Sequence, residues 1–286
     1  MDANDAEKHV EVEGINYCTL LEPPTSKSPE AAAAAPCVLL IHVLMSNLHM
    51  WDATVQALHG AGYATLRYDH VGHHNTPPAH NEDANYHLDD LTRHAHQLVK
   101  ARTGQMHVQA VIGCSIGGVM ALRYAMMFPQ DVDRVISIAA PGIASPERTK
   151  TVWTERIRQF EEDRRTGGDG LCRATVERWF PGGRAQDDGV RAEALTHVQT
   201  CSLQGYKLLA DAIRGYDYTD EVGAVGKVRC LIVAGDEDGA IDPEHLREVA
   251  GKIERAEFEL MEMAGHLPPM QRPDRFNGMM LQSLRG

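Results

Sequence analysis

The sequence predicts an α/β fold in which helices cover a mostly parallel sheet. Short apolar runs such as VLLIHVL, VQAVIGC and RVISIAA are typical of strands that are buried on both faces. Helix-compatible segments alternate with these runs, which favours parallel strands joined by helical crossovers. Between residues 141 and 226 the β-type runs disappear and the sequence becomes charged and helix-compatible. We therefore expect a helical insertion in the α/β domain.

The chain begins with two short strands and then enters a segment of unusual composition. Alternating residues over 9–13, a glycine at position 14 and a second run over 15–21 predict an antiparallel pair at one edge of the sheet. The following stretch, 22–36, is rich in proline, serine and alanine. It predicts either an exposed loop or a short turn of helix.

From residue 37 onward, strands and helices alternate. The predicted strands cover 37–44, 63–68, 108–114, 135–139, 228–234 and 258–261. The predicted helices cover 51–58, 88–101, 116–128, a segment that begins after Pro243, and 273–284. This pattern divides the chain into the first part of a core domain (1–140), a helical cap (141–226) and the second part of the core (227–286).

Composition restricts the classes of partner and compartment. The chain has 286 residues, of which 43% are hydrophobic and 24% are charged, as in globular proteins. Its net charge of −12 disfavours nucleic acid and anionic membranes as partners. The six cysteines form no CxxC pair, and the N-terminal sequence lacks the features of a signal peptide. We expect a cytoplasmic protein that binds a small molecule. The sequence is compatible with a homodimer but does not require one.

The most informative motif is Gly113-Cys114-Ser115-Ile116-Gly117, which lies between a predicted strand and a predicted helix. A GxSxG sequence in this context forms a sharp turn that exposes a nucleophilic serine. The turn requires small residues two positions before and after the serine, which the two glycines provide. The side chain of Cys114 is expected to point into the core as a small buried filler. The motif predicts Ser115 as a nucleophile.

A serine nucleophile needs a base and an orienting acid, which in this kind of fold follow it in the order Ser, Asp, His. His266 follows the last predicted strand and is the predicted base. Asp238 is the preferred acid, with Asp236, Glu237 and Asp242 as competitors. Asp242 is more suited to cap the helix that starts at Pro243.

Acyl transfer also needs two backbone N–H donors for the oxyanion. One should come from Ile116, directly after the nucleophile, and the other from the loop over 42–47, where Leu44 is the preferred donor.

These motifs resemble the α/β-hydrolase family, and within it the branch of the 3-oxoadipate enol-lactonases. The segments that carry the resemblance are 47–52, 68–69, 72–73, 113–118, 121–122, 124, 128–129, 177–181, 205–206, 212–213, 234–235, 238, 264–267, 273 and 276–277. The resemblance implies an α/β-hydrolase fold, a triad of Ser115, His266 and Asp238, a helical cap over the pocket, and no cofactor or metal.

Two departures from the branch concern the substrate. Val43 stands where a glycine or serine is common, and Val71 stands where an arginine is common. Val43 and, in the cap, Trp179 are the predicted substrate-binding residues. The expected substrate is therefore an enol-lactone or a less polar lactone or ester, hydrolysed through an acyl-enzyme. The sequence leaves open two alternatives: an acyltransferase that uses the same acyl-enzyme, and a hydrolase-fold receptor that binds a ligand without turnover.

Two further clusters invite other interpretations. Asp69, His70, His73 and His74 are residue types that bind zinc, but adjacent histidines are poorly placed to converge on one ion, so we expect a structural loop. The charged run over 156–165 is expected to be a solvated helix of the cap rather than a partner-binding patch.

Overall fold

The computed structural model describes residues 7–24, 34–80, 85–147 and 149–285. Within these residues, eight strands form one sheet in the order β1-β2-β4-β3-β5-β6-β7-β8. The strands are β1 (Glu7–Val12), β2 (Ile15–Glu22), β3 (Cys37–Ile41), β4 (Ala64–Tyr68), β5 (Val108–Cys114), β6 (Val132–Ile138), β7 (Arg229–Gly235) and β8 (Ala256–Met261). The predicted α/β architecture is confirmed.

The sheet is antiparallel only at its first edge. β1 pairs with β2, and β2 with β4, in antiparallel register, whereas the pairs from β4 through β3, β5, β6 and β7 to β8 are parallel. The turn between β1 and β2 contains Gly14 at φ 81°, a conformation that glycine adopts without strain. Most of the stretch over 22–36, predicted as a loop or a helical turn, lies outside the described residues.

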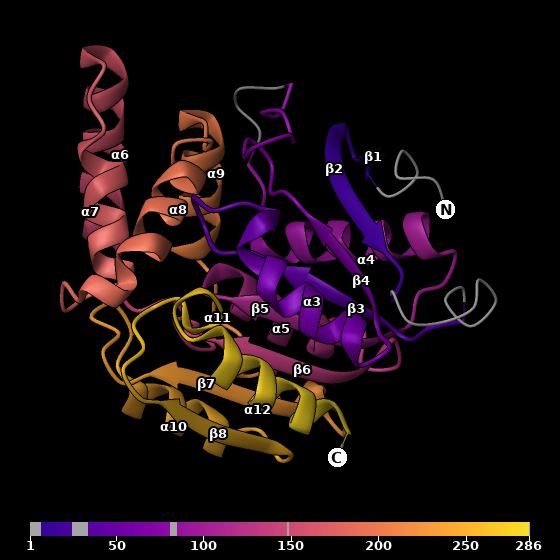
Figure 1. Cartoon of the computed structure of the whole chain (residues 1–286). Coiled ribbons are helices and arrows are strands. Elements are labelled where there is room, and N and C mark those ends of the chain that lie inside the picture. The colour runs from indigo at the N-terminus through magenta and orange to yellow at the C-terminus, as the bar shows by residue number, and fades with distance from the viewer. Residues whose placement is uncertain (1–6, 25–33, 81–84, 148, 286) are drawn as a thin grey trace.

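Helices cover both faces of the sheet (Figure 1). They are α3 (Asp52–Gly60), α4 (Leu88–Thr103), α5 (Ile116–Met127), α10 (Pro243–Gly251), α11 (Pro268–Gln271) and α12 (Pro273–Arg285). Contacts join α3 to α12 and α4 to α5, and α5 packs on β5 and β6. Residues 116–126 of α5 are all buried. The burial of each large apolar side chain stabilises the folded state by about 1.5–3 kcal/mol. This helix is therefore a firm support for the turn that precedes it.

A helical cap lies between β6 and β7. It contains α6 (Thr149–Thr166), α7 (Gly170–Trp179), α8 (Asp188–Val198) and α9 (Leu203–Ile213), with short 3₁₀ turns at Ala185–Asp187 and Val222–Val225. Figure 1 shows these four helices grouped beside the sheet, with α6 and α7 projecting as a pair. Of the helices in the described ranges, none is both long and apolar enough to cross a membrane.

Two strand boundaries differ from the prediction by three residues, the largest differences in the sheet, and one cap agrees with it. β3 ends at Ile41 rather than at residue 44, because the chain turns away from the sheet and reaches φ 73° at Met45. β6 begins at Val132, earlier than predicted, because it pairs there with Val108. The side chain of Asp242 accepts the N–H of Glu244 and caps α10, as expected.

Candidate active site

Ser115 occupies the sharp turn between β5 and α5. Its backbone has φ 56° and ψ −116°, which is strained for a residue with a side chain. The turn is held because Ser115 N–H donates to Ile138 O at 2.8 Å and Ser115 O accepts from Val119 N–H at 3.1 Å. The surrounding structure thus enforces a conformation that the residue would not adopt alone.

The glycines on either side of Ser115 are required by close backbone contacts. A Cβ at Gly113 would lie 1.9 Å from the carbonyl oxygen of Gly117, and a Cβ at Gly117 would lie 2.3 Å from the carbonyl oxygen of Ile41. Both contacts are far shorter than real side chains make, and neither partner can rotate away. The predicted need for small residues at these positions follows from these contacts.

The loops after β7 and β8 bring Asp238 and His266 together. Asp238 Oδ2 lies 2.7 Å from His266 Nδ1, and both side chains are buried. Asp238 Oδ1 accepts the N–H groups of Ala240 and Ile241 at 2.8 and 3.2 Å, which fixes the carboxylate. An imidazole that donates Nδ1–H to a carboxylate leaves Nε2 to accept a proton, as a general base requires.

The other acidic candidates have different partners. Asp236 accepts the N–H of Ala264, and Glu237 forms an ion pair with Arg184. Asp242 caps α10, as described above. Among the four acids that the sequence left in competition, the structure therefore places Asp238 against the imidazole.

The two predicted oxyanion donors lie at the carboxyl ends of neighbouring parallel strands. Leu44 follows β3, and Ile116 is the first residue of α5 after β5. In the described part of the chain, neither N–H donates to another group. Leu44 lines the same cavity as Ser115. Both backbone donors are thus available to a negatively charged oxygen that forms beside the serine.

Buried histidines hold the loop that carries Leu44. His70 N–H donates to His42 Nε2, and His70 Nε2–H donates to His42 O, each at 2.9 Å. His42 Nδ1–H donates to Val43 O at 2.8 Å. His42 Nε2 can accept the His70 N–H only while the His42 ring is neutral.

A third histidine supports the strained part of the same loop. Met45 N–H donates to His73 Nε2 at 3.1 Å, and His73 Nδ1–H donates to Val71 O at 2.9 Å. Met45 has φ 73°, so this hydrogen bond stabilises a conformation that a side chain disfavours. Protonation of His73 at Nε2 would remove the acceptor and release the turn beside Leu44.

The predicted structural role of the loop over 69–74 agrees with these contacts. Asp69 accepts the N–H groups of Leu48 and Asn75, and His74 lies against the ring of His49 rather than beside His73. Across the described ranges, no group of three or more His, Cys, Asp or Glu side chains is arranged to hold a metal ion.

Stability is expected to fall as the pH falls below about 6.5. Burial lowers the pKa of His70 to about 3 and that of His73 to about 4, and it lowers the pKa of His42 well below its usual value. The unfolded chain then binds protons that the folded chain excludes. Burial also raises the pKa of Asp69 to about 6, which offsets part of this effect. Between pH 7.5 and 5.5 these four groups together should lower the free energy of unfolding by about 3 kcal/mol. His197, whose pKa burial lowers to about 4, should add to this loss, which urea denaturation measures.

A matched pair of variants tests the origin of this acid sensitivity. His70→Gln keeps a side-chain donor for His42 O and should reduce the loss between pH 7.5 and 5.5 by about 1.4 kcal/mol. His107→Gln removes an exposed histidine and should behave as wild type. Equal pH dependence in all three proteins would show that the buried histidines are not the cause.

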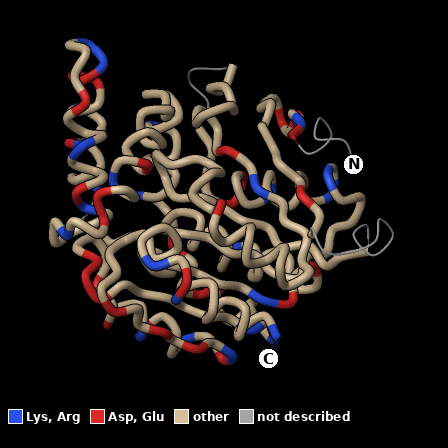
Figure 2. Tube along the Cα trace, in the orientation of Figure 1, with Lys and Arg blue, Asp and Glu red and all other residues tan. Residues whose placement is uncertain are grey.

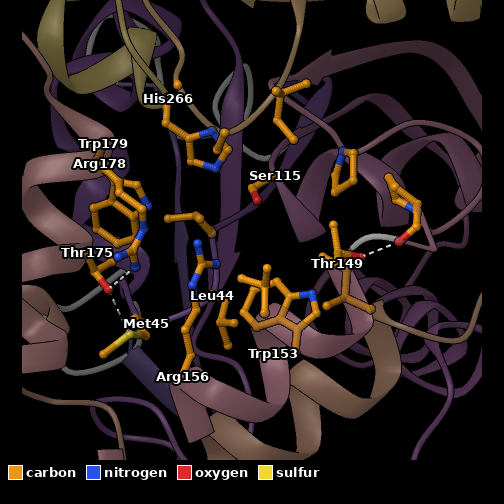
Figure 3. A pocket seen from close by; sticks show the side chains of 18 of the residues that line it. Leu44, Met45, Ser115, Thr149, Trp153, Arg156, Thr175, Arg178, Trp179 and His266 are labelled. Carbon is orange, nitrogen blue, oxygen red and sulfur yellow. Dashed lines mark hydrogen bonds between the residues drawn. The ribbon is translucent and has the colours of Figure 1, made fainter. Parts of the chain in front are cut away.

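The cavity in front of Ser115 lies between the sheet and the cap. It has a volume of about 420 Å³. Its lining comprises Val43, Leu44, Met45, Ser115, Pro141, Pro146, Thr149, Val152, Trp153, Arg156, Thr175, Arg178, Trp179, Tyr206, Ile213, Gly239, Ala240, Ile241, Asp242, His245 and His266. Figure 3 shows Ser115 and the His266 ring facing this space from the core, and Trp153, Thr175 and Trp179 facing it from the cap. The predicted substrate-binding residues Val43 and Trp179 both line the cavity.

The cap is attached directly to the loop of the candidate base. His266 N–H donates to Trp179 O at 2.9 Å. A Cβ at Gly265 would lie 2.3 Å from the same oxygen, so this contact requires glycine. On the core side, the thiol of the fully buried Cys114 donates to His266 O at 3.6 Å, in agreement with the filler role predicted for it.

Two arginines that the sequence motifs do not point to, Arg156 and Arg178, line the cavity. Arg156 was expected in a solvated helix, but it lines the cavity and is half-buried. It follows Trp153 by three residues and precedes the buried Phe160 by four, so helical spacing places all three on one face. Arg178 lies directly before Trp179 at the end of α7. The apolar spacing around Arg156 is the signal that could have revealed its inward position.

Comparison with known proteins agrees with this architecture. The α/β hydrolase fold family matches residues 36–167. Monoacylglycerol lipase ABHD6 of Homo sapiens is 21% identical over 263 residues, which cover 83% of this chain and 72% of the lipase.

Solved structures resemble the chain over nearly its whole length. The enol-lactonase from Burkholderia xenovorans is 25% identical with a TM-score of 0.82, covering 97% of this chain and 100% of that one. A thermophilic esterase from Thermogutta terrifontis has the same TM-score, 0.82, at 19% identity, covering 98% of this chain and 97% of the esterase. Together with the sheet order and the turn at Ser115, these similarities show that the chain has an α/β-hydrolase fold.

Proposed function

We propose that the chain is a serine hydrolase that cleaves a lactone or a carboxylic ester through an acyl-enzyme. The observation that carries this proposal is the placement of Ser115, on a strained turn, in the same cavity as the buried His266–Asp238 pair. The similarity to an enol-lactonase and to a monoacylglycerol lipase supports ester chemistry. A hydroxyl needs such a base in order to become a useful nucleophile at neutral pH.

The proposed reaction has two steps. Ser115 Oγ attacks the substrate carbonyl while His266 Nε2 takes its proton, and Asp238 stabilises the imidazolium that forms. The N–H groups of Leu44 and Ile116 bind the oxyanion until the alcohol leaves with the proton from His266. In a lactone the leaving alcohol stays attached to the acyl chain. Water, deprotonated by His266, then attacks the acyl-enzyme and releases the acid.

A covalent probe and a substrate panel test this proposal together. An alkyl fluorophosphonate should add one phosphonyl group to the wild-type protein, detected by intact-mass spectrometry, and none to Ser115→Ala. Ser283→Ala, which changes a serine of α12 remote from the cavity, should be labelled like wild type. In a pH-stat, the wild type should release acid from enol-lactones, larger lactones or simple esters.

Three results would contradict the proposal. Labelling of Ser115→Ala at the wild-type rate would place the nucleophile elsewhere. Formation of a new ester from an added alcohol, in preference to acid release, would indicate an acyltransferase. Saturable binding of panel compounds without any product would instead indicate a receptor.

A further inference from the structure

A buried polar bridge joins the cap to the loop of the candidate base. Gly265, directly before His266, donates its N–H to Gln271 Oε1 at 2.6 Å. Gln271 Nε2–H donates in turn to Asp187 Oδ2 at 2.9 Å. Gln271 belongs to α11 and Asp187 to the cap, and both residues are buried. One side chain thus connects the cap to the peptide group that precedes the imidazole.

The charge of Asp187 sets the orientation of the Gln271 amide. Although burial raises the pKa of Asp187, hydrogen bonds from Arg272 and Gln271 hold it below its usual value, so the carboxyl group is ionised near neutral pH. Arg272 Nη1–H donates to Asp187 Oδ1 at 2.6 Å. Because a carboxylate can only accept hydrogen bonds, it faces the NH₂ group of Gln271. The carbonyl oxygen of the amide is thereby turned toward the N–H of Gly265.

The bridge differs from the charged pairs on the surface of the cap. Figure 2 shows acidic and basic residues interspersed along α6 and α7. One exposed pair there joins Arg165 to Glu162, and pairs of this kind restrain their partners weakly. The side chain of Asp187, in contrast, is only 2% exposed. A buried carboxylate is costly unless its partners are held in good geometry, so this bridge restrains them closely.

The cap segment 179–187 contacts the loops of both the acid and the base. His266 N–H donates to a carbonyl oxygen of this segment at 2.9 Å. Arg184 forms an ion pair with Glu237, which directly precedes Asp238. The polar bridge adds a third contact, through Gly265, to the same segment. The position of the acid–base pair therefore depends on this part of the cap.

We propose that Gln271 is a positioning residue for the reaction and that Asp187 acts through it. The bridge holds the peptide group of Gly265, and this keeps the imidazole of His266 aligned with Ser115. This inference rests on the proposed function. A general base works only when its acceptor nitrogen is held within hydrogen-bond reach of the proton that it takes. A displacement of about 1 Å can lower the rate by about 100-fold.

Two matched glutamine variants test this role. Gln271→Met removes both hydrogen bonds of the bridge and keeps an unbranched side chain of similar length. In this variant kcat should fall by about 10- to 100-fold with KM nearly unchanged, because the base is misaligned while the cavity lining is retained. The control is Gln204→Met, since Gln204 Nε2–H joins the cap to a different part of the core, at Ala79 O. Equal losses in the two variants would overturn the inference.

A second substitution tests whether the two residues act through one bridge, and it also serves if Gln271→Met does not fold. Asp187→Asn leaves one acceptor oxygen, which cannot serve both Gln271 and Arg272 in their present positions. Its kcat should fall by about 10-fold, again with little change in KM. The double variant should lose no more than Gln271→Met alone. Losses that multiply in the double variant, or a wild-type kcat in Asp187→Asn, would overturn the inference.

Proton NMR separates a failure of this inference from a failure of the proposed function. The Nδ1 proton that His266 donates to Asp238 should give a strongly deshielded resonance, which requires no substrate. Gln271→Met should shift or broaden this resonance, and Gln204→Met should leave it unchanged. That result would support the bridge even if the wild type neither hydrolysed an ester nor reacted with the fluorophosphonate. An unchanged resonance in folded Gln271→Met would overturn the inference and leave the proposed function intact.

Discussion

Replacement of Ser115 by alanine is expected to lower kcat for any ester or lactone substrate by about 10⁴- to 10⁶-fold. The loss should be this large because the hydroxyl forms the new bond, and neither water nor a neighbouring side chain can take its position on the turn. Residual hydrolysis above the rate in water should persist, since the oxyanion donors at Leu44 and Ile116 remain. The measurement is acid release in a pH-stat under saturating substrate.

The same change should leave stability nearly unaltered, which separates chemistry from folding. Alanine keeps the Cβ of serine, so the backbone strain at φ 56° is the same in both proteins. The Ser115 hydroxyl faces the cavity, and its loss leaves no buried partner without a hydrogen bond. The midpoint of urea unfolding should therefore shift by less than the equivalent of about 1 kcal/mol. Full activity in Ser115→Ala would refute the assignment of the nucleophile.

Replacement of Gly113 by alanine is expected to destabilise the protein by more than about 4 kcal/mol or to prevent folding. The added Cβ would meet the carbonyl carbon and oxygen of Gly117 at 2.2 and 1.9 Å. Both atoms belong to the first turn of α5, whose buried face is packed on the sheet. Relief of the clash would require the helix to move away from β5, which would also displace Ser115. Thermal unfolding followed by circular dichroism measures the effect.

A glycine in open space provides the matched control. A Cβ at Gly278, in the exposed part of α12, has no atom within 4 Å. Gly278→Ala should therefore stabilise the protein by about 0.5–1 kcal/mol, since alanine is the better helix former. If Gly113→Ala unfolded at a temperature close to that of Gly278→Ala, the inference that the turn has no room for a Cβ at Gly113 would be refuted.

Features that depend on local sequence could be predicted well. The alternation of apolar runs and helical segments predicted the α/β fold, because a strand buried on both faces excludes polar residues along its whole length. The spacing of Gly113, Ser115 and Gly117 predicted the turn, because its tightness is set by five consecutive residues. Boundaries were less accurate where, as after Ile41, a neighbouring element ends the strand.

Features that depend on how segments dock could not be predicted. The inward direction of Arg156 and Arg178 requires α6 and α7 to pack over the cavity in a particular rotation, and a charged helix carries only weak information about that rotation. The pairing of His42 with His70, and of Met45 with His73, joins segments that are 28 residues apart. Their neutral state follows from burial, which composition does not reveal.

The sequence by itself therefore determined the fold class, the turn at Ser115 and the chain order of candidate nucleophile, acid and base. Only the tertiary structure decided which of four neighbouring acids meets His266, because the loop after β7 turns Asp238 inward and gives Asp236, Glu237 and Asp242 other partners. It also decided the charge of the cavity. Local motifs are specified by contacts within a few residues, whereas the choice of partner and the electrostatics of a cavity arise from segments that meet only in the folded chain.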